Sequence, residues 1–257
     1  MEAYAADASL KGKLRRRYAR LAHRRPARVR LERPLVSISF DDAPESAADV
    51  GAAILDARGV KGTYFISMGL AGETGPMGRN AGPAQLRALL AAGHEIACHT
   101  HSHLDCGRAS PEAVRADADR NRGALAELGA PDPEVFAFPY GDVSAGSKRV
   151  LGDRYRLLRA LHHGVIHDGS DLNQAPAVGI EGADGESVAR RWLERALAEP
   201  AWLILYSHDL GQTPSPWGCT PAALERLLGR ALAGGAEVVT VGEGCRRIGA
   251  RAGGLSG

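Results

Sequence analysis

The stretch LVSISFDDAP, residues 35–44, contains the two features that decide the fold. Its apolar start, with valine, isoleucine and phenylalanine, favours a buried strand. The strand runs directly into two adjacent carboxylates, Asp41 and Asp42. Two buried negative charges are costly without a counterion, and a divalent metal is a natural one. Taken alone, an ordinary turn in which Asp42 caps the next helix explains the pair equally well.

A second polar cluster, HTHSHLD (residues 99–105), follows another strand candidate. His99 and His103 are four residues apart, which on a helical turn places both imidazoles on one face. Two histidines and one carboxylate suit a catalytic zinc or a similar metal. An HxxxH spacing alone is a weak signal. Its place at a strand end, together with the paired aspartates at another, indicates a metal site.

Two further strand candidates end in polar residues, in the segments FAFPYGD (residues 136–142) and LILYSHD (residues 203–209). Each alone is compatible with an ordinary loop, and a single histidine such as His208 is more often structural. Four such strand ends together indicate one site, because barrel enzymes place their catalytic residues at the carboxyl ends of parallel strands.

Strand candidates alternate with longer amphipathic stretches, which predicts a parallel α/β architecture. The number of candidates favours a (β/α) barrel. A doubly wound open sheet is the alternative, but no Gly-rich fingerprint follows the first strand. The expected strands are residues 35–40, 60–66, 94–98, 135–138, 157–161, 177–180, 202–206 and 237–241.

Residues that typically begin and end helices separate these strands. Ser46, Ser110 and Thr220 can cap the turns that follow them, and Pro83 suits a first helical position. Glycines suited to ending these four helices are Gly59, Gly93, Gly129 and Gly234.

The segments FDDAP (residues 40–44), HTHSH (99–103), FPYG (138–141) and LYSH (205–208) resemble, in order and spacing, the motifs of the polysaccharide deacetylase family, carbohydrate esterase family four. The resemblance implies an α/β fold: a distorted (β/α) barrel, usually of seven strands, so one strand candidate would lie outside it. It implies a catalytic domain over residues 34–257 after a basic extension, residues 1–33. The implied activity is metal-dependent removal of acetyl from an N-acetylated sugar of a cell-surface glycan or its precursor.

The family pattern also implies roles for individual residues. One divalent metal is expected, zinc above all, although the same ligands accept cobalt, nickel or iron. Substrate contacts are expected at Pro139 and Tyr140. A further contact is expected at Trp217 from the sequence itself, because its loop follows His208, and the ring can stack on a sugar or simply anchor this Pro-rich loop. The implied catalytic set is Asp41 as general base, His208 as general acid, the Tyr140 backbone N–H for the oxyanion, and Asp42, His99 and His103 as metal ligands.

Two departures from the family pattern keep alternatives open. Ala137 stands where an arginine often orients the base, so the partner of Asp41 is open, and Ala43 replaces a usual glycine. Asp168 and Asp171 are weak candidates for the carboxylate that tunes His208. Hydrolysis of another non-peptide amide or imide, or a non-catalytic glycan-binding barrel, is the alternative function.

The N-terminal segment concentrates positive charge, with many of the Lys and Arg between residues 11 and 33. A helix over residues 10–23 is expected, with Leu14, Tyr18 and Leu21 on one face. A solvated or packed helix is the simpler interpretation. The sharper one is peripheral contact with an anionic membrane, where each basic residue adds about 1 kcal/mol.

Composition is that of an ordinary globular protein, with 44% hydrophobic and 24% charged residues. A net charge of +2 gives no reason to expect a nucleic-acid partner. No secretory signal pattern or membrane-spanning run is expected, and four scattered cysteines do not form a disulfide framework. We therefore expect a cytoplasmic protein, with the inner face of the membrane as an option.

Overall fold

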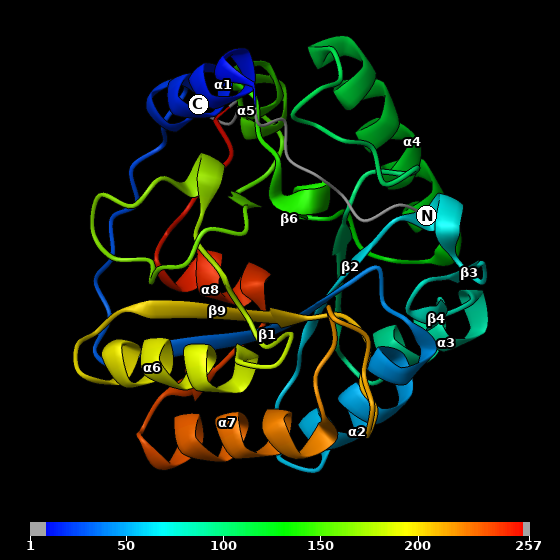
Figure 1. The fold of residues 1–257 in the computed structure, drawn as a ribbon, viewed down its shortest axis with the longest axis vertical. Coiled ribbons are helices and arrows are strands. Elements are labelled where there is room, and N and C mark those ends of the chain that lie inside the picture. Colours follow the sequence, from blue (N-terminus) through cyan, green and yellow to red (C-terminus); the bar gives the residue numbers. More distant parts are fainter. Residues whose placement is uncertain (1–8, 254–257) are drawn as a thin grey trace.

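The computed structural model describes residues 9–253, and its centre is a parallel sheet that curls into a partial barrel (Figure 1). Seven strands follow one another in the order β7-β6-β5-β2-β1-β9-β8, and every pairing along this path is parallel. The expected barrel is thus confirmed. Its strands are β1 (Leu35–Asp41), β2 (Thr63–Ile66), β5 (Glu95–Cys98), β6 (Val135–Ala137), β7 (Leu157–Arg159), β8 (Val178–Gly179) and β9 (Trp202–Ser207).

The eighth strand candidate lies outside this path, as the resemblance implied. β10 (Glu237–Val238) pairs only with the start of β1. The candidate was also too long, because Thr240 caps a helix from Val241 onward and its side chain accepts a hydrogen bond from the Glu243 N–H at 3.2 Å.

The two end strands of the sheet approach each other through the segment that leads into β8. A parallel bridge joins Arg159 to Ala175. The Ala160 N–H donates to the Ala175 carbonyl at 2.9 Å, and the Ala175 N–H donates to the Leu158 carbonyl at 2.8 Å. These bonds join the end of β7 to the segment before β8, so the two edges of the sheet come together.

Helices surround the curled sheet and cover its outer face (Figure 1). β1 and β9 are buried along their whole length, as expected of parallel strands covered on both faces. The helices are α1 (Leu10–Leu21), α2 (Ala52–Asp56), α3 (Pro83–Ala91), α4 (Pro111–Leu128), α5 (Ala145–Gly152), α6 (Gly185–Leu197), α7 (Pro221–Ala233) and α8 (Val241–Arg247), with short turns η1 (Ala47–Gly51), η2 (Met68–Leu70), η3 (Pro139–Gly141) and η4 (Leu172–Gln174). Three of these helices, α5, α6 and α8, were not expected from the sequence.

Three of the four expected helix starts are confirmed, and one is wrong. Ser110 and Thr220 accept a hydrogen bond from the N–H three residues on, and Pro83 opens α3. Ser46 itself has helical backbone angles and caps nothing. Its hydroxyl accepts from the Leu210 N–H at 3.0 Å, so it joins the first turn to the loop after β9 instead.

The N-terminal helix α1 packs against α5 (Figure 1). Ala19 is buried, and its carbonyl accepts a hydrogen bond from the Lys148 ammonium at 2.7 Å. Arg15 forms an ion pair with Asp142 at 2.6 Å. The described part of the N-terminal extension is therefore a packed element. Among the described residues, no helix combines the length and apolarity needed to cross a membrane.

Candidate active site and metal centre

The expected metal ligands lie at the ends of strands β1 and β5, which flank β2 in the sheet. Asp42 directly follows β1, and His99 directly follows β5. The expected helical turn between His99 and His103 is absent, which corrects that prediction. Instead Thr100 and His103 have left-handed backbone angles, with φ of 61° and 55°, and Asp42 has φ of 58°. Such angles cost about 1–3 kcal/mol each outside glycine and cluster at functional sites.

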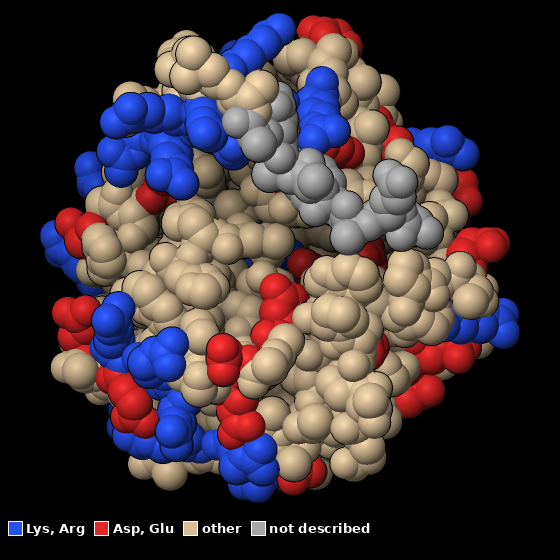
Figure 2. Space-filling view, in the orientation of Figure 1, with Lys and Arg blue, Asp and Glu red and all other residues tan. Residues whose placement is uncertain are grey.

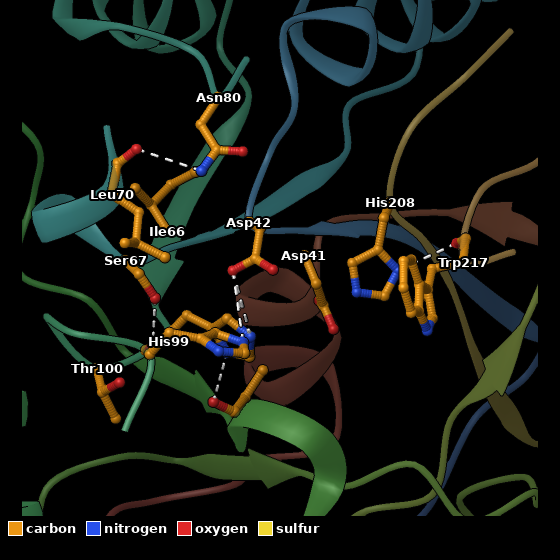
Figure 3. Close-up of polar contacts among 12 residues, drawn as sticks. Asp41, Asp42, Ile66, Ser67, Leu70, Asn80, His99, Thr100, His208 and Trp217 are labelled. Atoms are coloured by element: carbon orange, nitrogen blue, oxygen red, sulfur yellow. Dashed lines mark hydrogen bonds and ion pairs between the residues drawn. The ribbon is translucent and has the colours of Figure 1, made fainter. Parts of the chain in front are cut away.

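Asp42, His99 and His103 form a compact set of metal-binding groups. One ligand atom from each lies within 4.8 Å of the others. Figure 3 shows the Asp42 carboxylate pointing toward the His99 ring. The Asp42 Oδ1 atom is 3.6 Å from His103 Nε2 and 4.0 Å from His99 Nε2. This oxygen is buried and accepts no hydrogen bond from the described residues. A buried carboxylate oxygen without a donor is costly, and a cation between these groups would remove that cost.

The two imidazoles are held as neutral ligands. Burial lowers the pKa of His99 and of His103 to about 4. His99 Nδ1 lies 2.8 Å from the Ala137 carbonyl and donates to it, which leaves the Nε2 lone pair for a metal. Burial raises the pKa of Asp42. A divalent cation would reverse that direction, so this donor set fits a metal.

The partner of Asp41, left open by Ala137, is Arg159 on the next strand. Ala137 and Arg159 are register partners in the β6–β7 pairing, so the arginine reaches the same place from one strand further on. The Arg159 Nη2 donates to Asp41 Oδ2, and the guanidinium is fully buried. It lies 5.1 Å from the ring centroids of Phe65 and of Tyr206.

This ion pair keeps Asp41 ionised. Burial alone would raise the Asp41 pKa, but the charge of Arg159, followed by His99 and His208, outweighs it and lowers the pKa. The second oxygen, Oδ1, is buried without a hydrogen-bond partner among the described residues. Asp41 lines the cavity between Asp42 and His208 (Figure 3). It therefore presents one carboxylate oxygen that can accept a proton.

His208 directly follows β9, and its neighbours favour the cationic form of its imidazole. Its Nδ1 lies 3.1 Å from the Trp217 carbonyl and 3.6 Å from Glu181 Oε2. Burial would lower the His208 pKa, but the nearby Glu181 carboxylate and the charges of Asp41 and Asp42 raise it to about 9. The Tyr206 hydroxyl donates to the other Glu181 oxygen at 2.8 Å and orients this carboxylate.

The two aspartates suggested for tuning His208 do not do so, because both are engaged elsewhere. Asp171 forms an ion pair with Lys148 at 2.6 Å and accepts from the Arg25 N–H. Asp168 accepts from the Val29 N–H at 3.2 Å. Glu181 fills the role, and the signal available in the sequence was its position directly after a strand candidate. For Arg159 the signal was a charged residue inside an apolar strand candidate.

One cavity of about 350 Å³ is lined by the polar residues of the site, namely Asp41, Asp42, His99, His103, Glu181 and His208. Tyr140 lines it with left-handed backbone angles, and its ring packs on His103 at 4.5 Å between centroids. Trp217, which is 36% exposed, lies at the cavity. Pro139 is buried in η3 outside the lining, and its contact with substrate stays a prediction. A hairpin of β3 (Thr74–Gly75) and β4 (Gly78–Arg79), not expected from the sequence, contributes to the wall.

Comparisons with known proteins match the chain to a family and to a fold. The family model described as polysaccharide deacetylase matches residues 28–153. A bifunctional xylanase/deacetylase from Pseudobutyrivibrio xylanivorans is 25% identical over 113 residues, which are 43% of this chain and 17% of that protein. The chain therefore spans about a sixth of the length of this curated relative.

Two solved structures share the fold. The Xyl-CE4 domain of a xylanase from the hindgut metagenome of Trinervitermes trinervoides is 21% identical with a TM-score of 0.62, covering 86% of this chain and 94% of that one. A family 4 acetyl xylan esterase from Clostridium thermocellum, solved with a cobalt ion, is 21% identical with a TM-score of 0.55, covering 81% of this chain and 89% of that one.

Proposed function

Since this chain belongs to the polysaccharide deacetylase family, we propose that it is a metal-dependent hydrolase that removes acetyl from an N-acetylated sugar. One observation carries the proposal. An ionised carboxylate, a cationic imidazole and a set of metal-binding groups face the same cavity. Amide hydrolysis needs a base for the water and an acid for the leaving amine, and a binding site needs neither.

Asp42, His99 and His103 would hold one divalent metal. Two imidazoles and one carboxylate suit zinc, and also cobalt, nickel or iron. When bound, such a metal supplies Lewis-acid polarisation of the amide carbonyl and lowers the pKa of a water molecule. The chain's own contribution is to keep both imidazoles neutral and the His99 ring fixed by the Ala137 carbonyl.

Asp41 acts as the general base in this proposal. Arg159 holds its Oδ2, which leaves Oδ1 to accept a proton from the attacking water. Because Arg159 is buried and packed between two aromatic rings, the carboxylate cannot rotate without breaking the ion pair. We assign the Tyr140 backbone N–H to the developing oxyanion, a contribution on the order of 3 kcal/mol for a well-placed donor.

His208 acts as the general acid. The Trp217 carbonyl and Glu181 both lie at Nδ1, so the proton on Nδ1 is committed and Nε2 is the nitrogen that can protonate the leaving amine. A pKa of about 9 keeps the imidazole cationic at neutral pH. Trp217 also offers its ring as a platform for the sugar.

The substrate proposed is a sugar of a cell-surface glycan or its precursor, handled in the cytoplasm. The test is acetate release from a panel of N-acetylated monosaccharides and oligosaccharides by zinc-loaded protein, with His99→Ala as the metal-site control. Zinc-dependent release lost in the variant is the expected result. Full zinc occupancy without release from any acetylated compound would instead favour hydrolysis of another amide or imide, or a non-catalytic glycan-binding barrel.

Residues 11–33 are proposed to contact an anionic membrane surface, and α1 offers the face for it. Four large apolar side chains of this helix are exposed: Leu10 (74%), Leu14 (58%), Tyr18 (64%) and Leu21 (73%). The helix has no acidic residue, and Lys and Arg gather over this part of the surface (Figure 2). An apolar stripe flanked by basic residues is the pattern of interfacial helices.

The membrane test uses Leu14→Asp, because deleting the segment would remove the buried Ala19 and its bond with Lys148. Val50→Asp, at an exposed apolar position outside α1, is the matched control. We expect the Leu14 variant alone to lose sedimentation with vesicles of phosphatidylserine and phosphatidylcholine. Equal binding of both variants, or no binding of the wild type, would contradict the proposal.

A further inference from the structure

A second, smaller cavity lies beside the catalytic one. Its volume is about 100 Å³, several times the ~30 Å³ that one water molecule occupies. It lies between α1 and the turns that follow β6 and β7. The polar side chains in its wall that matter here are Arg16, Arg20, His162 and Gln174.

The two cavities are lined by adjacent residues of the same two turns. Tyr140 lines the catalytic cavity and Gly141, the next residue, lines the smaller one. On the neighbouring turn, Leu161 lines the catalytic cavity and His162 lines the smaller one. Consecutive Cα atoms are about 3.8 Å apart, so a group in the smaller cavity lies within about one sugar ring of the catalytic cavity.

The smaller cavity has an excess of positive charge. Among the described residues of its wall, the one acidic side chain is that of Asp142, which forms an ion pair with Arg15 at 2.6 Å and accepts from the Val143 N–H at 3.0 Å. No described residue forms an ion pair with Arg20. Arg16 adds a second guanidinium to the wall. An anion would complement this charge distribution.

A second observation points to a ligand. The side-chain oxygen of Gln174 is buried and has no hydrogen-bond partner among the described residues. Because the oxygen and nitrogen of an amide are assigned by their surroundings, this side chain can turn its NH₂ group into the cavity. A buried amide oxygen without a partner is costly, and after this turn Gln174 would offer the cavity a hydrogen-bond donor.

We propose that this cavity binds a phosphate group of the substrate, so that the enzyme acts on an N-acetylated sugar that carries a phosphate or diphosphate. The inference rests on the proposed deacetylation and names the class of its substrate. Guanidinium groups match phosphate oxygens bidentately, and a partly enclosed site is screened less by salt than an open surface. The sugar's acetamido group would then lie in the catalytic cavity.

The first test compares kcat/KM for an N-acetylhexosamine 1-phosphate and for the methyl glycoside of the same sugar. We expect the phosphate to raise kcat/KM by about tenfold or more, the size of one charge-assisted hydrogen-bond pair. Arg20→Gln removes that advantage and leaves the methyl glycoside unchanged. Arg17→Gln, an exposed position on the same helix outside the cavity, keeps the advantage. Equal kcat/KM for both sugars in the wild type overturns the inference while leaving deacetylation intact.

A second test reads the cavity without turnover. Burial and then the charge of Arg20 lower the pKa of His162. Inorganic phosphate bound beside it should raise the His162 pKa in NMR titrations of zinc-loaded protein and of Arg17→Gln, but not of Arg20→Gln. An unchanged His162 pKa in all three would overturn the inference. Nucleoside-diphosphate and prenyl-diphosphate forms of the sugar then show which source of phosphate gives the largest kcat/KM.

Discussion

The cavity contains two kinds of buried histidine, and their pKa values move in opposite directions. Burial lowers the pKa of His99 and His103 to about 4, whereas His208 is raised to about 9. The difference lies in the neighbours. His99 Nδ1 faces the neutral carbonyl of Ala137, while His208 Nδ1 lies 3.6 Å from the Glu181 carboxylate. Carboxylates oppose burial at all three histidines, but only at His208, where Glu181 acts together with Asp41 and Asp42, do they outweigh it. One fold can therefore hold neutral and cationic imidazoles side by side.

The pKa values of the two adjacent aspartates also move in opposite directions. Asp41 is paired with Arg159 and has a lowered pKa, whereas burial raises the pKa of its neighbour Asp42. One carboxylate has a built-in counterion and the other lies among metal-binding groups. In the proposed function the site therefore divides into a proton-transfer half, which carries its own charge partners, and a metal half, which would need a cation.

The largest effect is expected for Asp41→Asn, which separates these halves. It removes the base, so kcat should fall by about 10²–10⁴-fold. The metal ligands are untouched, so zinc content measured by elemental analysis should stay at one per chain. His103→Ala is the reciprocal control and should lose zinc as well as activity. Loss of zinc in Asp41→Asn would break the division.

Arg159→Leu should be the next largest change. It leaves the Asp41 carboxylate buried without a counterion, which costs about 3–5 kcal/mol of unfolding free energy. The Asp41 pKa should rise, so the acid limb of the kcat/KM profile moves to higher pH because the active, ionised form appears later. Urea unfolding and a pH–rate profile measure the two effects.

Two double variants sharpen that test. Arg159→Leu with Asp41→Asn should regain most of the stability, since no unpaired charge remains. Arg159→Ala with Ala137→Arg returns the guanidinium to the register partner and should restore part of the activity. A stable Arg159→Leu enzyme with an unchanged acid limb would show that the ion pair does not tune Asp41.

Glu181→Gln should have a smaller effect, mainly on pH dependence. Removing the carboxylate lowers the His208 pKa, and the cationic imidazole is the active form, so the alkaline limb of kcat/KM moves to lower pH. Asp168→Asn is the matched control and should leave the limb in place, because Asp168 caps a backbone N–H elsewhere. An alkaline limb that moves with Asp168 instead would contradict the assignment.

Trp217→Ala should have the smallest effect. The ring contributes stacking of about 0.5–1.5 kcal/mol, which corresponds to a KM about 2–12-fold higher for the sugar. The Trp217 carbonyl that contacts His208 is backbone and remains, so kcat should hardly change. A large fall in kcat with an unchanged KM would mean that the side chain positions the acid rather than the sugar.

The sequence predicted one half of the site better than the other, for a physical reason. The metal ligands lie at strand ends within two short motifs, so local order along the chain was enough to group Asp42, His99 and His103. Arg159 and Glu181 act across strands, and their reach depends on sheet register. The sequence shows that Ala137 replaces the usual arginine. It does not show that the register partner of Ala137 on the next strand is an arginine.

The strands could be predicted from the sequence, whereas one helix start and one turn could not. All eight strand candidates exist, because parallel strands buried on both faces form short apolar runs between helices. The Ser46 cap failed because that hydroxyl bonds to the distant loop after β9. The turn at His99 failed because Thr100 and His103 have left-handed backbone angles, which a helical turn excludes and which residue type alone does not predict.

The most direct test of the account is acetate release from one N-acetylated sugar by metal-stripped protein, before and after one equivalent of zinc, in the wild type and in Asp41→Asn. We expect no release before zinc, release by the wild type after it, and almost none by the zinc-loaded variant. Release that is independent of zinc, or equal in the two proteins, would contradict it.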